Sequence, residues 1–309
     1  MGDLAHARVH PEVAEAIAAG RPVVALESVV VTHGLPPPTN IRLALDMEAA
    51  VRAEGAVPAT VAILDGLLRV GLERTELEDL AAREGARKCS VKDLAYAVGM
   101  GLSGGTTVAA TAWVAHRVGI RAFATGGTGG VHPGVGERLD VSADLPALAA
   151  CPILVVSAGA KSILDLPNTA EVLETLSVPV IGYGTDFLPG FHTRETPIRL
   201  DARVDSPEEA ARVVAARDAL GLTQAVLLVQ PVPEEAAVPA EAVAQAAEAA
   251  TRRAREAGVT GHRVTPFVLA ALNESERDPR FLRANLALLQ ANARLAARVA
   301  VELAAPARA

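Results

Sequence analysis

Residues 151–165 read CPILVVSAGAKSILD, and this stretch predicts both a fold class and a chemical site. The apolar run PILVVS (152–157) has the length and β-branched content of a strand that is buried on both faces. Small residues end the run, and Lys161 then stands as the only Asp, Glu, Lys or Arg between Leu145 and Leu164. Strands of this kind belong to largely parallel sheets covered by helices, where sites collect at the carboxyl ends of the strands.

The same strand pattern recurs along the chain, separated by amphipathic segments. Apolar runs that read as buried strands are PVVAL (22–26), ATVAIL (59–64), RAFAT (121–125), VPVIGY (178–183) and AVLLVQ (225–230). We expect helices to follow Thr39, a Thr75/Glu78 capping box and Ser206, and a long helix over Arg280–Ala304. This alternation predicts an α/β fold: a three-layer α/β/α arrangement with a central, largely parallel sheet and helices on both faces, formed by one domain over residues 1–309.

The composition restricts the class of protein. Net charge is −7 and the isoelectric point is about 5.6, which argues against binding a nucleic acid polymer. Apolar stretches are interrupted well short of a membrane span, and the N-terminus lacks the apolar core of a secretory signal. With only two cysteines the chain has no disulfide framework. We expect a cytoplasmic protein without membrane association.

Lysine is rare in this sequence. Of 29 basic residues only Lys88, Lys92 and Lys161 are lysines, and the other 26 are arginines. Arginine can replace lysine in most solvated ion pairs, but it cannot lose its proton or form an imine. The surviving lysines are candidates for chemistry that needs an amine, although codon bias and drift could also leave three of them.

Glu27 stands at the end of the first apolar run, in PVVALESVVVTHG. It is the only Asp, Glu, Lys or Arg between Arg21 and Arg42. A carboxyl group there is partly removed from water, which favours the neutral acid and suits a general acid or base. The alternative is a glutamate that caps a loop or pairs with an arginine.

Two further segments offer ligand-binding groups. ATGGTGGVHPG (124–134) follows a predicted strand and could cradle a phosphate or sugar with its backbone N–H groups, or could simply be a tight turn. LDVSADL (139–145) offers Asp140, Ser142 and Asp144, which are oxygen ligands of the kind that Mg²⁺ and Mn²⁺ accept. Ser142 or Asp144 could instead cap the helix that begins near LPALAA.

Together these features favour a sugar-phosphate enzyme that uses imine or acid–base chemistry. The sequence also resembles the pseudouridine-5′-phosphate glycosidase family through ordered motifs from about residue 20 to residue 300. The motifs are ALESVVVTHGLPPPTN, KCSVKDL, GGTTVAAT, FATGGTGGVHPG, LDVSADL, SAGAKSILD, ETLSVPVIGY and TPFVLAAL.

The resemblance implies a homotrimeric α/β/α enzyme that requires one Mn²⁺ per subunit. Its substrate would be pseudouridine 5′-phosphate, which it would cleave reversibly to uracil and ribose 5-phosphate. By motif, Lys161 matches the nucleophile, Glu27 the proton donor and Asp140 the metal ligand. The positions that match substrate-binding residues are Lys88, Val108, Thr125, His132, Ser142, Ala143, Asp144 and Asn285, with Asn292 as the alternative to Asn285.

The implied mechanism explains the lone lysine. A C-glycoside has no leaving oxygen or nitrogen to protonate, so hydrolysis by two carboxylates has no easy leaving group. If the ribose ring opens, a lysine amine can capture C1′ as an imine while Glu27 moves protons. Val29, Pro37, Pro133 and Gln230 depart from the family pattern around the expected binding region.

Two other interpretations remain open from the sequence. One is a different lysine-imine lyase or aldolase acting on a sugar phosphate. The other is a non-catalytic nucleotide-binding protein in which Lys161 only balances phosphate charge.

Overall fold

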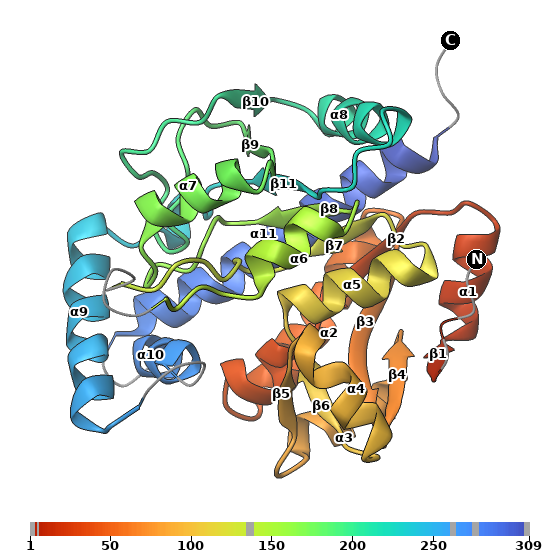
Figure 1. The fold of residues 1–309 in the computed structure, drawn as a ribbon, viewed down its shortest axis with the longest axis horizontal. Coiled ribbons are helices and arrows are strands. Elements are labelled where there is room, and N and C mark those ends of the chain that lie inside the picture. The colour runs from red at the N-terminus through yellow and green to blue at the C-terminus, as the bar shows by residue number, and fades with distance from the viewer. Residues whose placement is uncertain (1–3, 5, 134–138, 260–263, 274–277, 306–309) are drawn as a thin grey trace.

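The computed structural model describes residue 4 and residues 6–133, 139–259, 264–273 and 278–305. All six predicted strands are present, and they lie in one 11-stranded sheet (Figure 1). The order of its main path is β1-β4-β3-β2-β7-β8-β11-β9-β10, and β6 joins β5 to β3. Only the β3–β4 and β3–β6 pairs are antiparallel, so the prediction of a largely parallel sheet is confirmed. The strands are β1 (Ala7–Val9), β2 (Val23–Glu27), β3 (Val57–Leu64), β4 (Leu67–Val70), β5 (Arg87–Cys89), β6 (Gly104–Thr106), β7 (Ala122–Ala124), β8 (Leu154–Ser157), β9 (Val180–Tyr183), β10 (Ala202–Val204) and β11 (Val226–Val229).

Helices fill most of the chain between the strands. They are α1 (Pro11–Ala18), α2 (Thr39–Ala53), α3 (Arg74–Ala82), α4 (Val91–Gly99), α5 (Val108–Val118), α6 (Asp144–Ala150), α7 (Leu166–Thr175), α8 (Pro207–Ala219), α9 (Ala240–Glu256), α10 (Val264–Asn273) and α11 (Pro279–Ala304). A π-helical turn, η1 (Val30–Gly34), follows β2, and a 3₁₀ turn, η2 (Glu234–Ala236), precedes α9.

The predicted helix starts are right for two helices. Ser206 caps α8 by accepting the Glu209 N–H at 3.2 Å, and α11 begins within one residue of the expected start. The Thr75/Glu78 capping box is wrong, because the reciprocal pair at α3 is Glu73 with Glu76, whose carboxylate accepts the Glu73 N–H at 2.9 Å. Glu78 instead pairs with Arg74 at 2.8 Å. The helix expected to follow Thr39 is also shifted by one residue: α2 begins at Thr39 itself, and Pro38 occupies the cap position.

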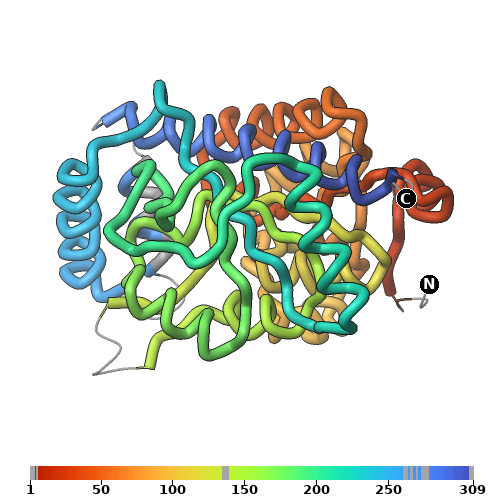
Figure 2. Tube along the Cα trace, turned by 90° about the horizontal axis from the view of Figure 1, so that it is seen from above, coloured from red at the N-terminus to blue at the C-terminus, as the bar shows by residue number. Residues whose placement is uncertain are grey.

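Two hydrophobic cores lie on opposite faces of the sheet, as a three-layer α/β/α arrangement requires. Alternate residues of the strands separate them: Val24 and Leu26 of β2 pack with α2, α8 and α11, whereas Val23 and Ala25 pack with α1, α4, α5 and α6. In the view of Figure 1, α5 and α6 lie in front of the sheet and α11 behind it. Figure 2 shows α11 running beside α2 along the length of the molecule.

Four adjacent parallel strands set up the edge at which the sequence predicts a site. Strand β2 pairs with β7, β7 with β8 and β8 with β11, all in parallel register. Their carboxyl ends therefore meet at one edge of the sheet, where ligand sites of doubly wound folds lie.

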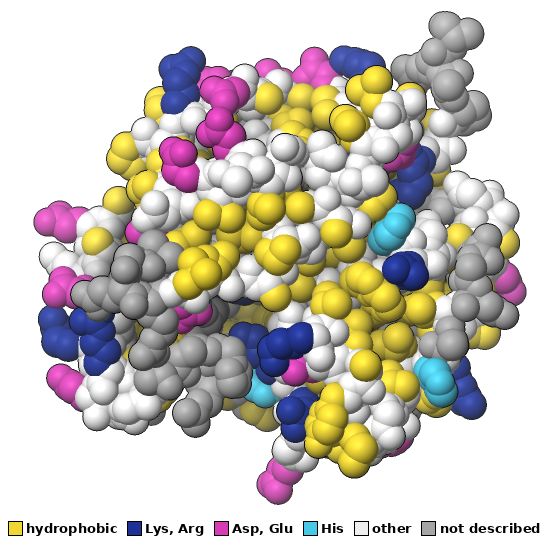
Figure 3. Space-filling model, viewed as in Figure 1, with side chains coloured by type: hydrophobic (Ala, Val, Ile, Leu, Met, Phe, Trp, Pro, Cys, Tyr) yellow, Lys and Arg dark blue, Asp and Glu magenta, His cyan; other side chains and the backbone are white. Residues whose placement is uncertain are grey.

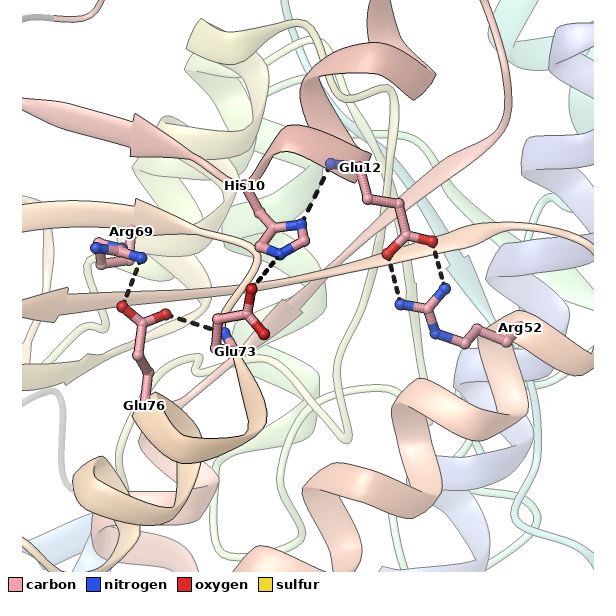
Figure 4. Close-up of polar contacts among 6 residues, drawn as sticks. All are labelled: His10, Glu12, Arg52, Arg69, Glu73 and Glu76. Atoms are coloured by element: carbon pink, nitrogen blue, oxygen red, sulfur yellow. Dashed lines mark hydrogen bonds and ion pairs between the residues drawn. The ribbon is translucent and has the colours of Figure 1, made fainter.

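Polar contacts tie the N-terminal segment to its neighbours (Figure 4). His10 Nδ1 accepts the Glu12 N–H at 3.3 Å, and His10 Nε2 lies 2.8 Å from Glu73 Oε1. The two terminal guanidinium nitrogens of Arg52 donate to the Glu12 carboxylate, at 2.6 and 2.7 Å. The Arg52 and Glu12 side chains are 50% and 37% exposed, so water screens this pair strongly.

The surface gives two further observations. Among the helices of the described residues, none combines the length and the apolar character that a membrane span requires. On the face drawn in Figure 3, Lys and Arg side chains lie apart or beside Asp and Glu, so that face has no continuous basic surface.

We expect buried apolar side chains to contribute more to the free energy of unfolding than exposed ion pairs do. We expect Arg52→Ala to lower the free energy of unfolding by less than about 1 kcal/mol, because the pair is exposed. Leu228→Ala, in the fully buried strand β11, should lower it by about 2–5 kcal/mol through lost burial and cavity formation. Urea unfolding of both variants measures the difference, and equal losses would contradict this assignment.

Candidate active site

A cavity of about 380 Å³ lies at the carboxyl edge of the sheet. Its wall includes Glu27 at the end of β2, Gly126 and Gly127 after β7, and Lys161 after β8. Every predicted site residue except Thr125 lines it: Glu27, Lys88, Val108, His132, Asp140, Ser142, Ala143, Asp144, Lys161 and Asn285. Residues spread over more than 250 positions of sequence are thus brought together.

The lysines of the chain gather in this cavity. Lys88, Lys92 and Lys161 all line it, whereas no arginine of the described residues does. In a protein with 26 arginines, random replacement would not leave the three lysines in one place. Because arginine supplies charge equally well, this distribution favours a role for at least one free amine.

Glu27 carries a buried carboxyl group that interacts with the charge of Lys161. It is 6% exposed, and burial raises its pKa, while the charge of Lys161 and a hydrogen bond from Thr125 oppose the rise. The Thr125 hydroxyl donates to Glu27 Oε1, and Glu27 Oε2 has no hydrogen-bond partner among the described residues. A raised pKa keeps the proton on this group at higher pH, which suits a general acid.

Lys161 lies on a short loop that pairs with the glycine-rich loop. Its N–H donates to the Thr128 carbonyl at 3.1 Å, and the Thr128 N–H donates to the Gly159 carbonyl at 3.1 Å. The nearby Lys88 amine has its pKa lowered, first by burial and then by the positive charge of Lys161. Lys88 and Glu27 therefore lie in a poorly hydrated part of the cavity wall.

Close packing explains the glycines of the 126–130 loop. A Cβ at Gly127 would lie 2.5 Å from the Phe191 ring and 2.9 Å from the Gly159 carbonyl, and one at Gly126 would lie 3.0 Å from Leu289. The N–H groups of Thr128 and Gly129 have protein acceptors, whereas those of Gly126, Gly127 and Gly130 have none among the described residues. Gly126 and Gly127 line the cavity, so their N–H groups are the ones available to an anion. Gly134, part of the motif quoted above, lies outside the described residues.

The two aspartates of LDVSADL differ in their surroundings. Asp144 is buried, and its carboxylate accepts the Ala109 N–H of α5 at 2.9 Å and the Gly129 N–H at 2.8 Å. It therefore caps α5 and holds the glycine loop, although it is itself the first residue of α6. Asp140 is half-buried on the cavity wall, beside His132, whose N–H donates to the Asp140 carbonyl at 2.9 Å. Burial lowers the pKa of His132, and the Asp140 carboxylate opposes this shift.

The donor set around Asp140 fits a loosely held hard cation. Asp140 lines the cavity, and the described residues contain no group of three or more His, Cys, Asp or Glu that could hold an ion by themselves. A divalent ion there would complete its shell with water or ligand oxygens, as Mg²⁺ and Mn²⁺ commonly do.

The two asparagines of α11 occupy distinct places. Asn285 lines the cavity, whereas Asn292 is fully buried and donates to the Thr125 carbonyl at 2.8 Å. Of the four departures from the family pattern, only Val29 lines the cavity. Gln230 donates to Asn292 at 2.8 Å, and Pro37 and Pro133 are exposed.

Sequence reasoning missed several residues of the wall. Lys92, on the first turn of α4, was singled out only as one of the three lysines, and Phe191 was not singled out at all. Phe191 has φ +64°, a left-handed conformation that costs a non-glycine residue about 1–3 kcal/mol. Rare lysine usage was the available signal for Lys92, but nothing in the sequence marks Phe191.

The fold and cavity define an α/β/α enzyme with an acid and an amine at the sheet edge. The family model described as "Indigoidine synthase A like protein" matches residues 12–302, and the chain belongs to this family.

Several relatives carry a more specific name. The chain is 50% identical to a pseudouridine-5′-phosphate glycosidase of Mesorhizobium japonicum over 96% of each sequence. It is 51% identical to one of a Jannaschia species, over 94% of this chain and 96% of the relative.

Two solved structures share the fold. An indigoidine synthase A-like protein of Thermotoga maritima has a TM-score of 0.89, with 36% identity over 99% of both chains. The prealnumycin C-glycosynthase AlnA, in complex with ribulose 5-phosphate, has a TM-score of 0.88, with 39% identity over 96% of this chain and 97% of the other.

Gly127→Ala should disrupt the cavity wall. The new methyl group would overlap the Phe191 ring, so we expect a loss of about 1–3 kcal/mol of stability and reduced turnover. Gly99→Ala, at a position with no atom within 4 Å of the added Cβ, is the matched control and should be neutral or stabilising. Thermal unfolding and activity of the two variants check this, and a fully active Gly127→Ala protein would show that the loop tolerates the methyl group.

Proposed function

We propose that this protein is a pseudouridine-5′-phosphate glycosidase, which reversibly cleaves the C–C glycosidic bond of pseudouridine 5′-phosphate to uracil and ribose 5-phosphate in pseudouridine catabolism. The observation that carries the proposal is the cavity in which a buried Glu27 meets Lys161 and the other two lysines of the chain. Relatives about 50% identical bear this name, and a structural relative that forms C-glycosides binds a pentose phosphate.

Glu27 acts first as a general acid. Burial raises the pKa of its carboxyl group, which favours the protonated form, and this acid donates a proton to O4′ as the C1′–O4′ bond of the ribose breaks. The resulting carboxylate is stabilised by the Thr125 hydroxyl and by the positive charge nearby.

Lys161 acts as the nucleophile. Its free amine attacks C1′ as the C1′–O4′ bond breaks. The Glu27 carboxylate then takes a proton from the secondary ammonium that has formed and delivers it to C5 of the uracil. The C1′–C5 bond breaks as the nitrogen lone pair forms the C1′=N bond of the imine, and neutral uracil leaves. Water then hydrolyses the imine to ribose 5-phosphate and regenerates the amine.

The rest of the wall supplies binding groups. Lys88, Lys92 and the N–H groups of Gly126 and Gly127 offer donors to a phosphate dianion. His132, Ser142, Ala143, Asp144, Val108 and Asn285 surround the remaining space as candidates for ribose and base contacts, with Thr125 behind Glu27.

We propose Mn²⁺ as the cofactor, one ion per subunit, held by Asp140 with water and substrate oxygens. An ion bound there would neutralise negative charge on the substrate. The family resemblance also leads us to propose a cytoplasmic homotrimer, and the two free cysteines, Cys89 and Cys151, agree with a reducing compartment.

Lys161→Arg should abolish turnover while the fold persists. Arginine keeps the charge and approximate length but cannot form an imine, so we expect kcat to fall by about a thousandfold or more. Lys88→Arg, the matched substitution at the neighbouring lysine, should act mainly on KM. Uracil release gives both constants, and a Lys161→Arg enzyme with wild-type kcat would exclude the imine mechanism.

Chelation should suppress activity, and added Mn²⁺ should restore it. Asp140→Asn should weaken Mn²⁺ binding by at least about tenfold, measured by electron paramagnetic resonance without substrate. Asp186→Asn, on an exposed surface pair with Arg203, is the control and should leave binding unchanged. Full activity of thoroughly chelated protein would contradict the metal requirement.

The enzyme should require the 5′-phosphate. Loss of charge-assisted hydrogen bonds worth about 1.5–3 kcal/mol each should lower kcat/KM for free pseudouridine by orders of magnitude. Uridine 5′-phosphate should also be a poor substrate, because its uracil leaves from nitrogen and needs no protonation at carbon. Equal values for pseudouridine and its phosphate would contradict the assignment of a phosphate site, and a preference for uridine 5′-phosphate would contradict the C-glycosidase assignment.

A further inference from the structure

A buried chain of hydrogen bonds connects the last helix to Glu27. Gln230 follows β11, Thr125 follows β7, and Glu27 ends β2, so three of the strands at the site edge contribute to it. Asn292 of α11 joins them: it contacts Gln230 on one side and the backbone of Thr125 and Gly126 on the other. None of these contacts involves the amine chemistry described above.

The orientation of the Asn292 amide is fixed by its partners. Its Nδ2 donates to the carbonyls of Thr125 and Gly126, at 2.8 and 3.3 Å, and carbonyl oxygens can only accept. Its Oδ1 must therefore face Gln230, whose Nε2 donates to it at 2.8 Å. Asn292 is fully buried, so this arrangement has no competition from water.

The helix explains how Asn292 reaches this position. Asn285 and Asn292 are seven residues apart in α11, close to two helical turns, so they project from the same face. Asn285 reaches the cavity, and Asn292 reaches the backbone behind it. One helix face thus contacts both the ligand space and the strand end that supports Glu27.

The chain ends on one oxygen of Glu27. The Thr125 hydroxyl donates to Oε1, and this oxygen is thereby held as an acceptor. Oε2 is buried and has no partner among the described residues, although Glu27 lines the cavity. The two oxygens of the carboxyl group are therefore not equivalent.

We propose that Asn292 and Gln230 are positioning residues for Glu27: they hold the Thr125 backbone so that its hydroxyl occupies Oε1 and the transferable proton resides on Oε2. The role of the proton rests on the proposed function, but the effect on Glu27 itself does not. Gln230, which departs from the family pattern, donates to Asn292 in this protein.

The test is the titration of Glu27 in the free protein, followed by carbon-13 NMR of labelled glutamate side chains and assigned with Glu27→Gln. Thr125→Val removes the donor to the carboxylate and should raise the Glu27 pKa by about one unit or more. Thr125→Ser keeps the hydroxyl and should restore the wild-type value. Asn292→Ala and Gln230→Met should shift the pKa in the same direction by smaller amounts, because they loosen the Thr125 backbone.

Thr60→Val is the matched control. Thr60 is another buried threonine whose hydroxyl donates to a glutamate, Glu48, at 2.5 Å, and neither residue lines the cavity. This substitution should cost similar stability but leave the Glu27 pKa and the kinetics unchanged.

Kinetics then separate positioning from general damage. Thr125→Val and Asn292→Ala should lower kcat by about ten- to a hundredfold with little change in KM, and Thr125→Val should move the fall of kcat at high pH to higher pH. A folded Asn292→Ala or Gln230→Met protein in which Glu27 titrates as in the wild type would overturn the inference. If the wild-type protein releases no uracil but the variants show the predicted shifts of the Glu27 pKa, the proposed function is overturned and the positioning role stands.

Discussion

The removal of the Glu27 carboxyl group from water is the constraint on which the site depends. An unpaired buried carboxylate would be costly, and the protein limits this cost by a raised pKa, a single hydrogen bond from Thr125 and nearby positive charge. All three require that β2, β7 and β8 lie side by side with their carboxyl ends level. The parallel sheet is thus the device that brings the acid and Lys161 together.

A second carboxylate stabilises the surrounding loops. Asp144 connects the start of α5 to Gly129, and the glycine loop in turn bonds the Lys161 loop through Thr128. Displacement of any one of these segments would move the other two. Two carboxyl groups in the same cavity therefore have different roles. Both oxygens of Asp144 accept hydrogen bonds from backbone N–H groups, whereas Oε2 of Glu27 has no hydrogen-bond partner among the described residues.

The sequence pattern predicted the buried strands and the charged residues that follow them, because both depend on short stretches of sequence. The long apolar runs all became strands, and the lone charges that follow them, Glu27 and Lys161, line the cavity. The short strands β1, β4, β5, β6 and β10 were missed, because a segment of three or four residues such as Gly104–Thr106 is too short for its periodicity to be detected. The bond between Thr125 and Glu27 could not be predicted either, since it depends on β2 lying next to β7, which chain order does not reveal. The left-handed backbone of Phe191 likewise arises from tertiary packing.

Covalent trapping tests the central claim most directly, because it detects the bond that the mechanism requires. The protein is incubated with ribose 5-phosphate and sodium borohydride, and the intact mass and peptides are then analysed by mass spectrometry. The account predicts one reduced pentose phosphate adduct per chain, located on Lys161 and absent from Lys161→Arg. Release of uracil by an enzyme that forms no adduct, or an adduct confined to Lys88 or Lys92, would contradict it.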